Sequence, residues 1–331
     1  ASSASSAIPA SRDAMRLLTA LVLPLALFAA MAHSAAPKPV TLKPVKVSEH
    51  AWYVQGLPGV ASPANQGFNS NAGFVVTPDG VVVIDALGTP ALGRGLLRAI
   101  RAVTDRPVRR VIVTHYHADH FYGLAAFKQA GAEVWAHRAA RDYLESGEGA
   151  ARLEQRRRDL KPWADDMKAL VGPDRWVEGD ASFVLGGVTF DLIYMGPAHA
   201  PDDLVVVVRN DQVLFSGDIL FSGRVPFVGN ADSKRWLATM DRLLDLRPAV
   251  MVPGHGPVSR DPAKDLAFTR EYLVYVRQAM GRAVEDMLPF EDAYRQTDWK
   301  RFEKVPAFDA ANRVNAYGTY LLMERESLEK K

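Results

Sequence analysis

Cysteine is absent from the 331 residues. Disulfide bonds, thiolate zinc sites and cysteine nucleophiles are therefore excluded, and any metal ion must be bound by histidine and carboxylate side chains. An excess of either charge is lacking too, because 40 Lys and Arg against 38 Asp and Glu leave a formal net charge of +2. This balance argues against nucleic acid as a partner, since nucleic-acid-binding proteins carry strongly basic surfaces. A small molecule is the expected ligand.

Extremes of composition are also lacking. Glycine (24 residues) and proline (21 residues) occur in ordinary numbers, and no internal repeat is visible. Collagen-like, disordered and repeat architectures are therefore excluded. At this length, 48% apolar and 24% charged residues match a single large α/β or sandwich domain.

One long apolar run lies near the start of the chain, from Leu17 to Ala32, and contains Pro24. A transmembrane helix needs about 20 apolar residues, so this shorter run fits a cleavable export signal better. Small residues suit cleavage after Ala32 or after Ala36. The alternative is an uncleaved membrane tether or lipid anchor.

Residues 1–14 precede Met15 and are left out of the fold prediction, so that residues 1–36 comprise an upstream segment and the signal peptide. The expected location is periplasmic or secreted. After cleavage of the signal, no stable membrane span is expected.

The apolar pattern of the remaining chain predicts strands first and then an alternation of helices and strands, which is typical of an α/β fold. Pro78, Asp79 and Gly80 separate two short apolar runs and predict a hairpin turn, because proline presets φ and glycine accepts a positive φ. The expected strands are 51–55, 73–77, 81–85, 110–114, 133–136, 182–185, 188–195, 204–209, 212–216 and 249–252. The expected helices are 90–103, 123–130, 138–146 and 234–246.

The segment 147–173 is strongly charged and has the character of an insertion. Within it, Leu160, Trp163, Met167 and Leu170 recur at helical spacing, with arginines and aspartates between them. This pattern predicts an amphipathic helix. The simpler interpretation is a helix that packs on the body of the domain, and the alternative is one that covers a pocket or binds a partner.

The strongest local signal is the motif HYHADH, which begins at His115 directly after an expected buried strand. A loop in this position can point His115 and His117 to one side and Asp119 and His120 to another, so that one loop holds two metal ions. Burial of three clustered imidazoles without a ligand is unfavourable, which argues against a purely structural loop.

Three further polar side chains follow expected strands. His199 and His255 lie in proline- and glycine-rich loops at the carboxyl ends of strands, where α/β folds place ligands. Asp218 lies among apolar residues just after another strand and needs a positive partner, which a metal pair would supply. A turn-capping aspartate is the alternative for Asp218. His137 opens a helix, and we interpret it as a supporting or structural residue.

With these motifs in this order, the chain resembles the metallo-β-lactamase-fold hydrolases over roughly residues 51–257. The resemblance implies an α/β fold, specifically an αββα four-layer sandwich of two mixed β-sheets flanked by helices. The catalytic domain is expected at 37–260, with the helical insertion 147–173. A C-terminal helical extension over 261–331, with breaks near Pro289 and Pro306, is expected to pack on the same domain.

The resemblance also implies two zinc ions per chain. The expected ligands of the first are His115, His117 and His199, those of the second are Asp119, His120 and His255, and Asp218 is expected to bridge both. Asp85, at the end of an expected strand, matches the family's aspartate that supports the metal-binding loop by contacting the ligands.

Two zinc ions about 4 Å apart would share a hydroxide whose pKa is lowered toward about 7, so no serine or cysteine nucleophile is required. Asp119 is expected to orient this hydroxide. The predicted reaction is hydrolysis of an activated small-molecule acyl compound, such as a thioester, a lactone or a β-lactam, in an exported compartment.

The resemblance leaves the substrate open. β-Lactamases of this family usually carry cysteine or serine at the position of Asp218, which counts against a dedicated enzyme, but a periplasmic metallo-β-lactamase stays as an alternative. Lactonases typically carry tyrosine where this chain has Phe221. The glutathione-binding C-terminal pattern of glyoxalase II-type thioester hydrolases is not recognisable. The tail around Asn312 and Asn315 is similar to exported zinc hydrolases of sulfur-oxidation and quinoprotein systems, which indicates no substrate.

Three other classes are weighed against the hydrolase. A non-catalytic binding protein that kept the fold but lost the site is disfavoured, because all seven expected ligands are present. A mononuclear iron thiol dioxygenase uses the same fold and a related loop but normally has fewer ligands than the seven found in this sequence. Nucleic-acid processing also occurs on this fold, and the near-neutral charge and the export signal argue against it.

Overall fold

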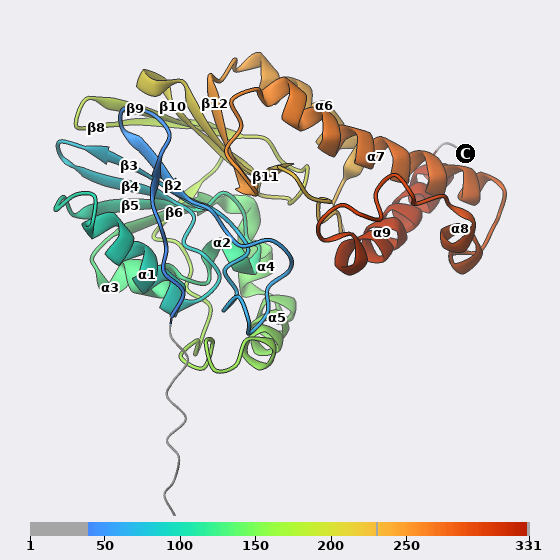
Figure 1. The fold of residues 1–331 in the computed structure, drawn as a ribbon, viewed down its shortest axis with the longest axis horizontal. Coiled ribbons are helices and arrows are strands. Elements are labelled where there is room, and N and C mark those ends of the chain that lie inside the picture. Colours follow the sequence, from blue (N-terminus) through green and yellow to red (C-terminus); the bar gives the residue numbers. More distant parts are fainter. Residues whose placement is uncertain (1–38, 230, 330–331) are drawn as a thin grey trace, which may run out of the picture. The chain divides into compact units, whose positions relative to one another are not determined.

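The computed structural model describes residues 39–229 and 231–329 (Figure 1). The predicted export signal and its cleavage positions lie outside these residues. Within the described part of the chain, no helix has the length and apolar character needed to cross a membrane.

Seven strands form the first sheet, in the order β1 to β7. Antiparallel pairing joins β1 through β4, and parallel pairing joins β4 through β7. The strands are β1 (Val45–Lys46), β2 (Ala51–Val54), β3 (Ala72–Thr77), β4 (Gly80–Ile84), β5 (Val108–Ile112), β6 (Glu133–His137) and β7 (Arg175–Val177).

Five strands form the second sheet, in the order β12-β11-β10-β9-β8. The pair β11 and β12 is parallel and the other neighbours are antiparallel. The strands are β8 (Ala181–Leu185), β9 (Val188–Tyr194), β10 (Leu204–Val208), β11 (Val213–Phe221) and β12 (Val250–His255). Both sheets therefore mix parallel and antiparallel neighbours.

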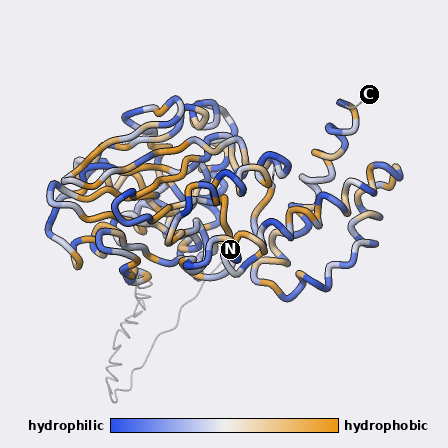
Figure 2. Tube along the Cα trace, turned by 90° about the horizontal axis from the view of Figure 1, so that it is seen from above, coloured by the Kyte–Doolittle hydropathy of each residue, from blue (hydrophilic) through white to orange (hydrophobic). Residues whose placement is uncertain are grey.

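Three hydrophobic clusters hold the layers together. The inner faces of the two sheets share one cluster, in which Ile84 and Ile112 of the first sheet join Val206 of the second. Gly73 leaves room for the ring of Phe215, since a side chain at position 73 would overlap it. The outer face of each sheet carries its own cluster with helices. Figure 2 shows hydrophobic residues along the strands and hydrophilic residues in many loops.

Helices cover both outer faces. On the first sheet lie α1 (Pro90–Arg101) and α3 (Leu124–Gln129), and on the second lie α6 (Ser233–Asp245) and α7 (Pro262–Glu285). The remaining helices are α2 (Ala118–Phe121), α4 (Arg141–Glu145), α5 (Gly147–Asp159), α8 (Phe290–Gln296) and α9 (Phe308–Glu329), with short 3-10 turns at Arg138–Ala140 and Arg209–Asp211. The predicted four-layer sandwich is confirmed.

Most predicted elements occur within a few residues of their expected bounds. The hairpin β3–β4 turns at Pro78 and Asp79, and Thr77 pairs with Gly80. Helix α1 begins after Thr89, whose hydroxyl accepts a hydrogen bond from Leu92 N at 3.1 Å. The short strands β1 and β7 were not predicted, because two or three residues carry no clear alternation.

The prediction of an amphipathic helix at residues 160–170 is wrong. The helix in the charged segment is α5, which ends at Asp159, and turns follow it. Pro162 explains the end, because proline lacks an N–H and disfavours the helical conformation of the residue before it. Leu160 and Met167 are nevertheless buried in the core of the first layer. The regular spacing of these residues therefore corresponds to buried positions in turns and not to a helix.

Candidate metal centre

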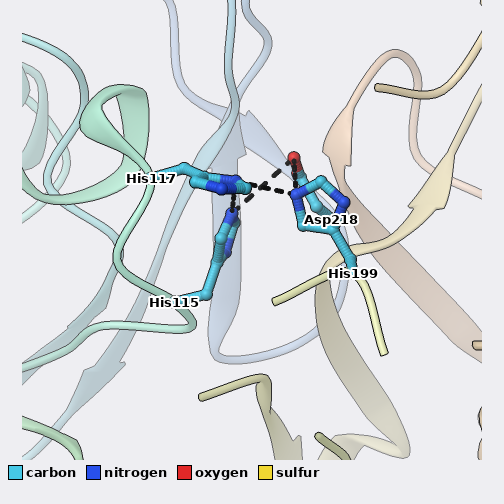
Figure 3. Close-up of side chains that lie close together, drawn as sticks. All are labelled: His115, His117, His199 and Asp218. Carbon is cyan, nitrogen blue, oxygen red and sulfur yellow. Dashed lines mark hydrogen bonds and ion pairs between the residues drawn. The ribbon is translucent and has the colours of Figure 1, made fainter. Parts of the chain in front are cut away.

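The candidate site lies where loops leave the strands of both sheets. The motif HYHADH follows β5, and its second half opens α2. His199 lies in the loop between β9 and β10, Asp218 lies within β11, and His255 ends β12. Two sheets therefore deliver side chains that are far apart in the sequence to one place (Figure 3).

One group of donors consists of His115, His117, His199 and Asp218, whose ligand atoms lie within 4.8 Å of one another. His117 Nδ1 lies 3.1 Å from His115 Nε2 and 2.8 Å from His199 Nε2. Figure 3 shows these rings pointing toward each other, with the Asp218 carboxylate beside them.

The other group consists of Asp119, His120 and His255, again within 4.8 Å of one another. Asp218, a member of the first group, also lies beside the second group. Its Oδ1 is 3.3 Å from His120 Nε2, and its Oδ2 is 3.3 Å from both His199 Nε2 and His255 Nε2. The structure thus brings all seven expected ligands together, with Asp218 adjacent to both groups.

Hydrogen bonds at the far side of three rings orient them. Thr114 Oγ1 lies 3.1 Å from His115 Nδ1, Asp85 Oδ2 lies 2.9 Å from His120 Nδ1, and the Asn69 carbonyl lies 2.7 Å from His255 Nδ1. Each Nδ1–H is assigned as the donor because an acceptor faces it. The Nε2 atom of each ring then faces the cluster, where it can act as a metal ligand.

Asp85 also anchors the loop itself. Its Oδ1 accepts from Thr114 N at 2.8 Å, and its Oδ2 accepts from the Thr114 hydroxyl at 2.9 Å. Asp85 has a positive φ of 64°, a conformation that aspartate tolerates better than most residues. One carboxylate therefore holds both the loop backbone and a ligand ring.

Burial and neighbouring charges set the protonation of the cluster. Burial lowers the pKa of His117 to about 3 and of His199 to about 4, and it lowers the pKa of His115 well below its usual range. Burial opposes ionisation of Asp218, but His255 and His120 outweigh it and lower the pKa of Asp218. Neutral imidazoles beside ionised carboxylates are the protonation state that metal binding requires.

His120 differs from the other rings. Burial alone would lower its pKa, yet the charges of Asp218 and Asp85 raise it well above the usual range. The local potential is therefore negative and favours a cation. His120 Nε2 and Asp218 Oδ1 lie 3.3 Å apart without hydrogen-bond geometry, and neither has a hydrogen-bond partner within the described residues. Such buried donors, convergent and unsatisfied, fit divalent cations.

Sequence reasoning missed the polar residues before β3. Asn69 Nδ2 donates to Asp119 Oδ2 at 2.8 Å, and Ser70 Oγ donates to the Asp119 carbonyl at 2.6 Å. The run of polar residues from 69 to 71, directly before a buried strand, was the signal available. His137 takes no part in either donor group, since its ring stacks on Tyr194 with centroids 3.9 Å apart.

A cavity of about 1640 Å³ adjoins the cluster, with His117, His199, Asp218 and His255 in its wall. Helix α5 contributes Arg156, among others, while its Leu153 packs into the core. Helix α5 of the insertion therefore packs on the domain and also lines a pocket.

Helix α9 forms part of the same wall and fixes the loop after β11. Asn315 accepts a hydrogen bond from Val228 N at 2.7 Å and donates to the Pro226 carbonyl at 2.7 Å and the Tyr272 hydroxyl at 3.0 Å. A side chain at Gly318 would overlap the Gly229 carbonyl. The tail motif noted in the sequence thus shapes the cavity.

The sequence profile of the metallo-beta-lactamase superfamily matches residues 65–255, more than half of the chain and the region that holds every donor of the cluster. The chain belongs to the metallo-beta-lactamase superfamily. Its homologues in that superfamily are metal-dependent hydrolases, and its own His/Asp cluster is suited to metal ions.

Among curated relatives, a linear primary-alkylsulfatase from Pseudomonas sp. is 24% identical over 238 residues, which cover 61% of this chain and 45% of that protein. A metallo-beta-lactamase type 2 from Bacteroides fragilis is 25% identical over 195 residues, covering 55% of this chain and 70% of that protein. The chain spans about half the length of the first of these relatives.

Among solved structures, a stereoselective inverting sec-alkylsulfatase from Pseudomonas sp. superimposes with a TM-score of 0.63 at 18% identity, covering 85% of this chain and 50% of that one. At this identity the likeness concerns the fold alone. The shared architecture is the two-sheet sandwich described above.

Proposed function

We propose that this protein is a dinuclear zinc hydrolase that cleaves an activated acyl bond, in a thioester, a lactone or a β-lactam, in an exported compartment. The position of Asp218 carries the proposal, because a carboxylate 3.3 Å from imidazoles of both donor groups suits two cations at once. Export is supported by the apolar run at residues 17–32. A small molecule rather than nucleic acid is supported by the balanced charge.

The residues that would hold the first ion are His115, His117 and His199, those for the second are Asp119, His120 and His255, and Asp218 would contact both. When bound, two divalent cations would supply a water of lowered pKa and would polarise the carbonyl oxygen of the acyl group. The chain needs no serine or cysteine nucleophile for this chemistry.

The protein's own part is to hold these donors rigid and to guide a proton. Thr114, Asp85 and the Asn69 carbonyl fix three rings through their Nδ1 atoms. Asp119 is held by Asn69 and Ser70 and lines the cavity, so its carboxylate can orient the attacking water and accept its proton.

Metal analysis by mass spectrometry, combined with hydrolysis assays on a cephalosporin, a glutathione thioester and an acyl lactone, tests the proposal. We expect two zinc ions per chain and clear hydrolysis of one substrate class. His117→Ala should lower metal content and hydrolysis together, whereas His50→Ala, whose ring contacts Asp211 outside the cluster, should lower neither. Full activity with one bound metal per chain would contradict the two-metal scheme, and bound iron with thiol-dependent oxygen uptake would favour a dioxygenase.

Hydrolysis of a sulfate ester is the second candidate. The relative named as a linear primary-alkylsulfatase supports it, and so does the buried cationic side chain of Arg224 in the cavity wall. A primary alkyl sulfate therefore belongs in the same assay panel. Hydrolysis of that compound alone would replace the acyl-bond proposal, and hydrolysis of the cephalosporin alone would identify a β-lactamase.

A further inference from the structure

Several arginines line the cavity without an ion pair in the described part of the chain, and two of them, Arg224 and Arg156, have buried polar atoms. The first is Arg224, in the loop after β11, which is only 6% exposed. Its Nη1 donates to the Gly59 carbonyl at 2.9 Å, and its Nε reaches the Val225 carbonyl at 3.5 Å. Within residues 39–229 and 231–329, no carboxylate lies at ion-pair distance from it. A buried guanidinium without a counterion is unfavourable.

The neighbouring ring of His255 does not satisfy Arg224. Arg224 Nη1 lies 3.4 Å from His255 Nδ1, but that nitrogen donates its hydrogen to the Asn69 carbonyl and cannot accept another. Burial lowers the pKa of Arg224, and the carboxylates that oppose this effect are Asp218 and Asp119. The proposed function assigns both carboxylates to metal ions.

The second arginine is Arg156, on the face of α5 that lines the same cavity. Its Nε is buried without a hydrogen-bond partner, and no ion pair of Arg156 occurs in the described part of the chain. The Nε of the next residue, Arg157, is also buried without a hydrogen-bond partner, but Arg157 pairs with Glu154 at 2.7 Å and does not line the cavity. The two adjacent arginines thus have different environments.

The charge of Arg156 reaches the metal-binding cluster. Burial raises the pKa of Asp119, but His120, His255 and Arg156 outweigh burial and lower it. Two stacked tyrosines, Tyr116 and Tyr143, also line the wall, and a phenol hydroxyl is neutral at neutral pH and supplies no counterion. Arg156 and Arg224 therefore place positive charge in the cavity wall near the cluster, and neither has a carboxylate at ion-pair distance within the described residues.

We propose that Arg156 and Arg224 form a binding site for an oxyanionic group of the substrate, a carboxylate or a sulfate, next to the bond that is cleaved. The inference rests on the proposed function, because it places this group in the same cavity as the metal ligands. It assigns the charged insertion a role in substrate selection. Guanidinium groups suit this role, since they form charge-assisted hydrogen bonds with carboxylate and sulfate oxygens.

Binding of inorganic sulfate to the zinc-loaded protein, measured by calorimetry, provides a test that needs no turnover. We expect Arg156→Gln and Arg224→Gln to weaken sulfate binding by about tenfold or more, because each removes a charge-assisted hydrogen bond. Arg157→Gln is the matched control, with the same charge change one residue away, and should bind sulfate as the unaltered protein does. Arg156→Lys should restore part of the affinity.

A kinetic test uses two esters of similar size, the anionic p-nitrophenyl hemisuccinate and the neutral p-nitrophenyl butyrate. The ratio of their kcat/KM values should fall about tenfold in Arg156→Gln and stay constant in Arg157→Gln. Comparing the kcat/KM for the hemisuccinate with the kcat/KM for an alkyl sulfate shows whether the site selects a carboxylate or a sulfate group.

Equal sulfate affinity in all variants would place the anion on the metal ions alone and overturn the inference, as would an unchanged kinetic ratio in Arg156→Gln. A folded, zinc-loaded protein that hydrolyses none of the esters would instead contradict the proposed function, and the calorimetry would still decide the role of the arginines. Because Arg224 is buried, its variant is interpreted together with Arg156→Gln, whose side chain is only partly buried.

Discussion

Gly254 and Asp218 lie so close together that any side chain at position 254 would overlap the Asp218 carboxylate. The contact arises because β12 runs parallel to β11, so that Gly254 in β12 lies directly beside Gly217 and Asp218 in β11. The position of Asp218 therefore requires glycine at position 254. This glycine is part of the candidate site although it offers no ligand.

Gly254→Ala is expected to displace the Asp218 carboxylate and to reduce zinc affinity about tenfold or more, because Asp218 lies next to both donor groups. Metal content per folded chain, measured by mass spectrometry after dialysis, checks this. Gly172→Ala is the control, since a Cβ at Gly172 would contact nothing. Normal zinc content in Gly254→Ala would show that the cluster tolerates movement of Asp218.

Asp85→Asn is expected to reduce zinc affinity by about 10- to 100-fold, because the amide is a weaker acceptor for His120 Nδ1–H than the carboxylate. Asparagine is chosen because, like aspartate, it tolerates the positive φ at this position. Competition with a zinc-binding dye gives the affinity. Asp241→Asn, which removes only an exposed ion pair with Arg270, should leave the affinity unchanged. An equal effect of both substitutions would contradict the role of Asp85.

Removal of metal is expected to destabilise the protein. A ligand bound only by the folded state contributes about 2.7 kcal/mol at a hundredfold excess over its dissociation constant. Treatment with EDTA should therefore lower the Tm by several degrees, and added zinc should restore it, while His117→Ala should show a smaller response. A Tm that is insensitive to EDTA in a protein first loaded with zinc would argue against a metal site in this cluster.

Asn315→Ala is expected to lower the free energy of unfolding by about 2–4 kcal/mol, because it leaves Val228 N–H and the Pro226 carbonyl without their hydrogen-bond partner. Urea denaturation followed by circular dichroism measures the change. Asn210→Ala, at an exposed turn, provides the comparison and should cost less than about 1 kcal/mol. A loss below that value at Asn315 would mean that the loop does not depend on α9.

The local part of the site could be predicted from the sequence because its residues are neighbours. HYHADH places four donors in six positions, and the strand before it directs the loop to the edge of the sheet. The spacing of Leu160 and Met167 predicted a helix that does not exist. Residues in the turns that follow α5 can also be buried at regular intervals, so regular spacing by itself does not show a helix.

The donor types and the order of the motifs were determined by the sequence alone, since the absence of cysteine restricts ligands to imidazole and carboxylate. The approach of His199, Asp218 and His255 to the loop after β5 was decided by the tertiary structure, through the packing of one sheet on the other. The same packing placed Arg156 and Arg224 in one cavity wall. Contacts between distant segments depend on sheet register and layer packing, which local residue patterns do not encode.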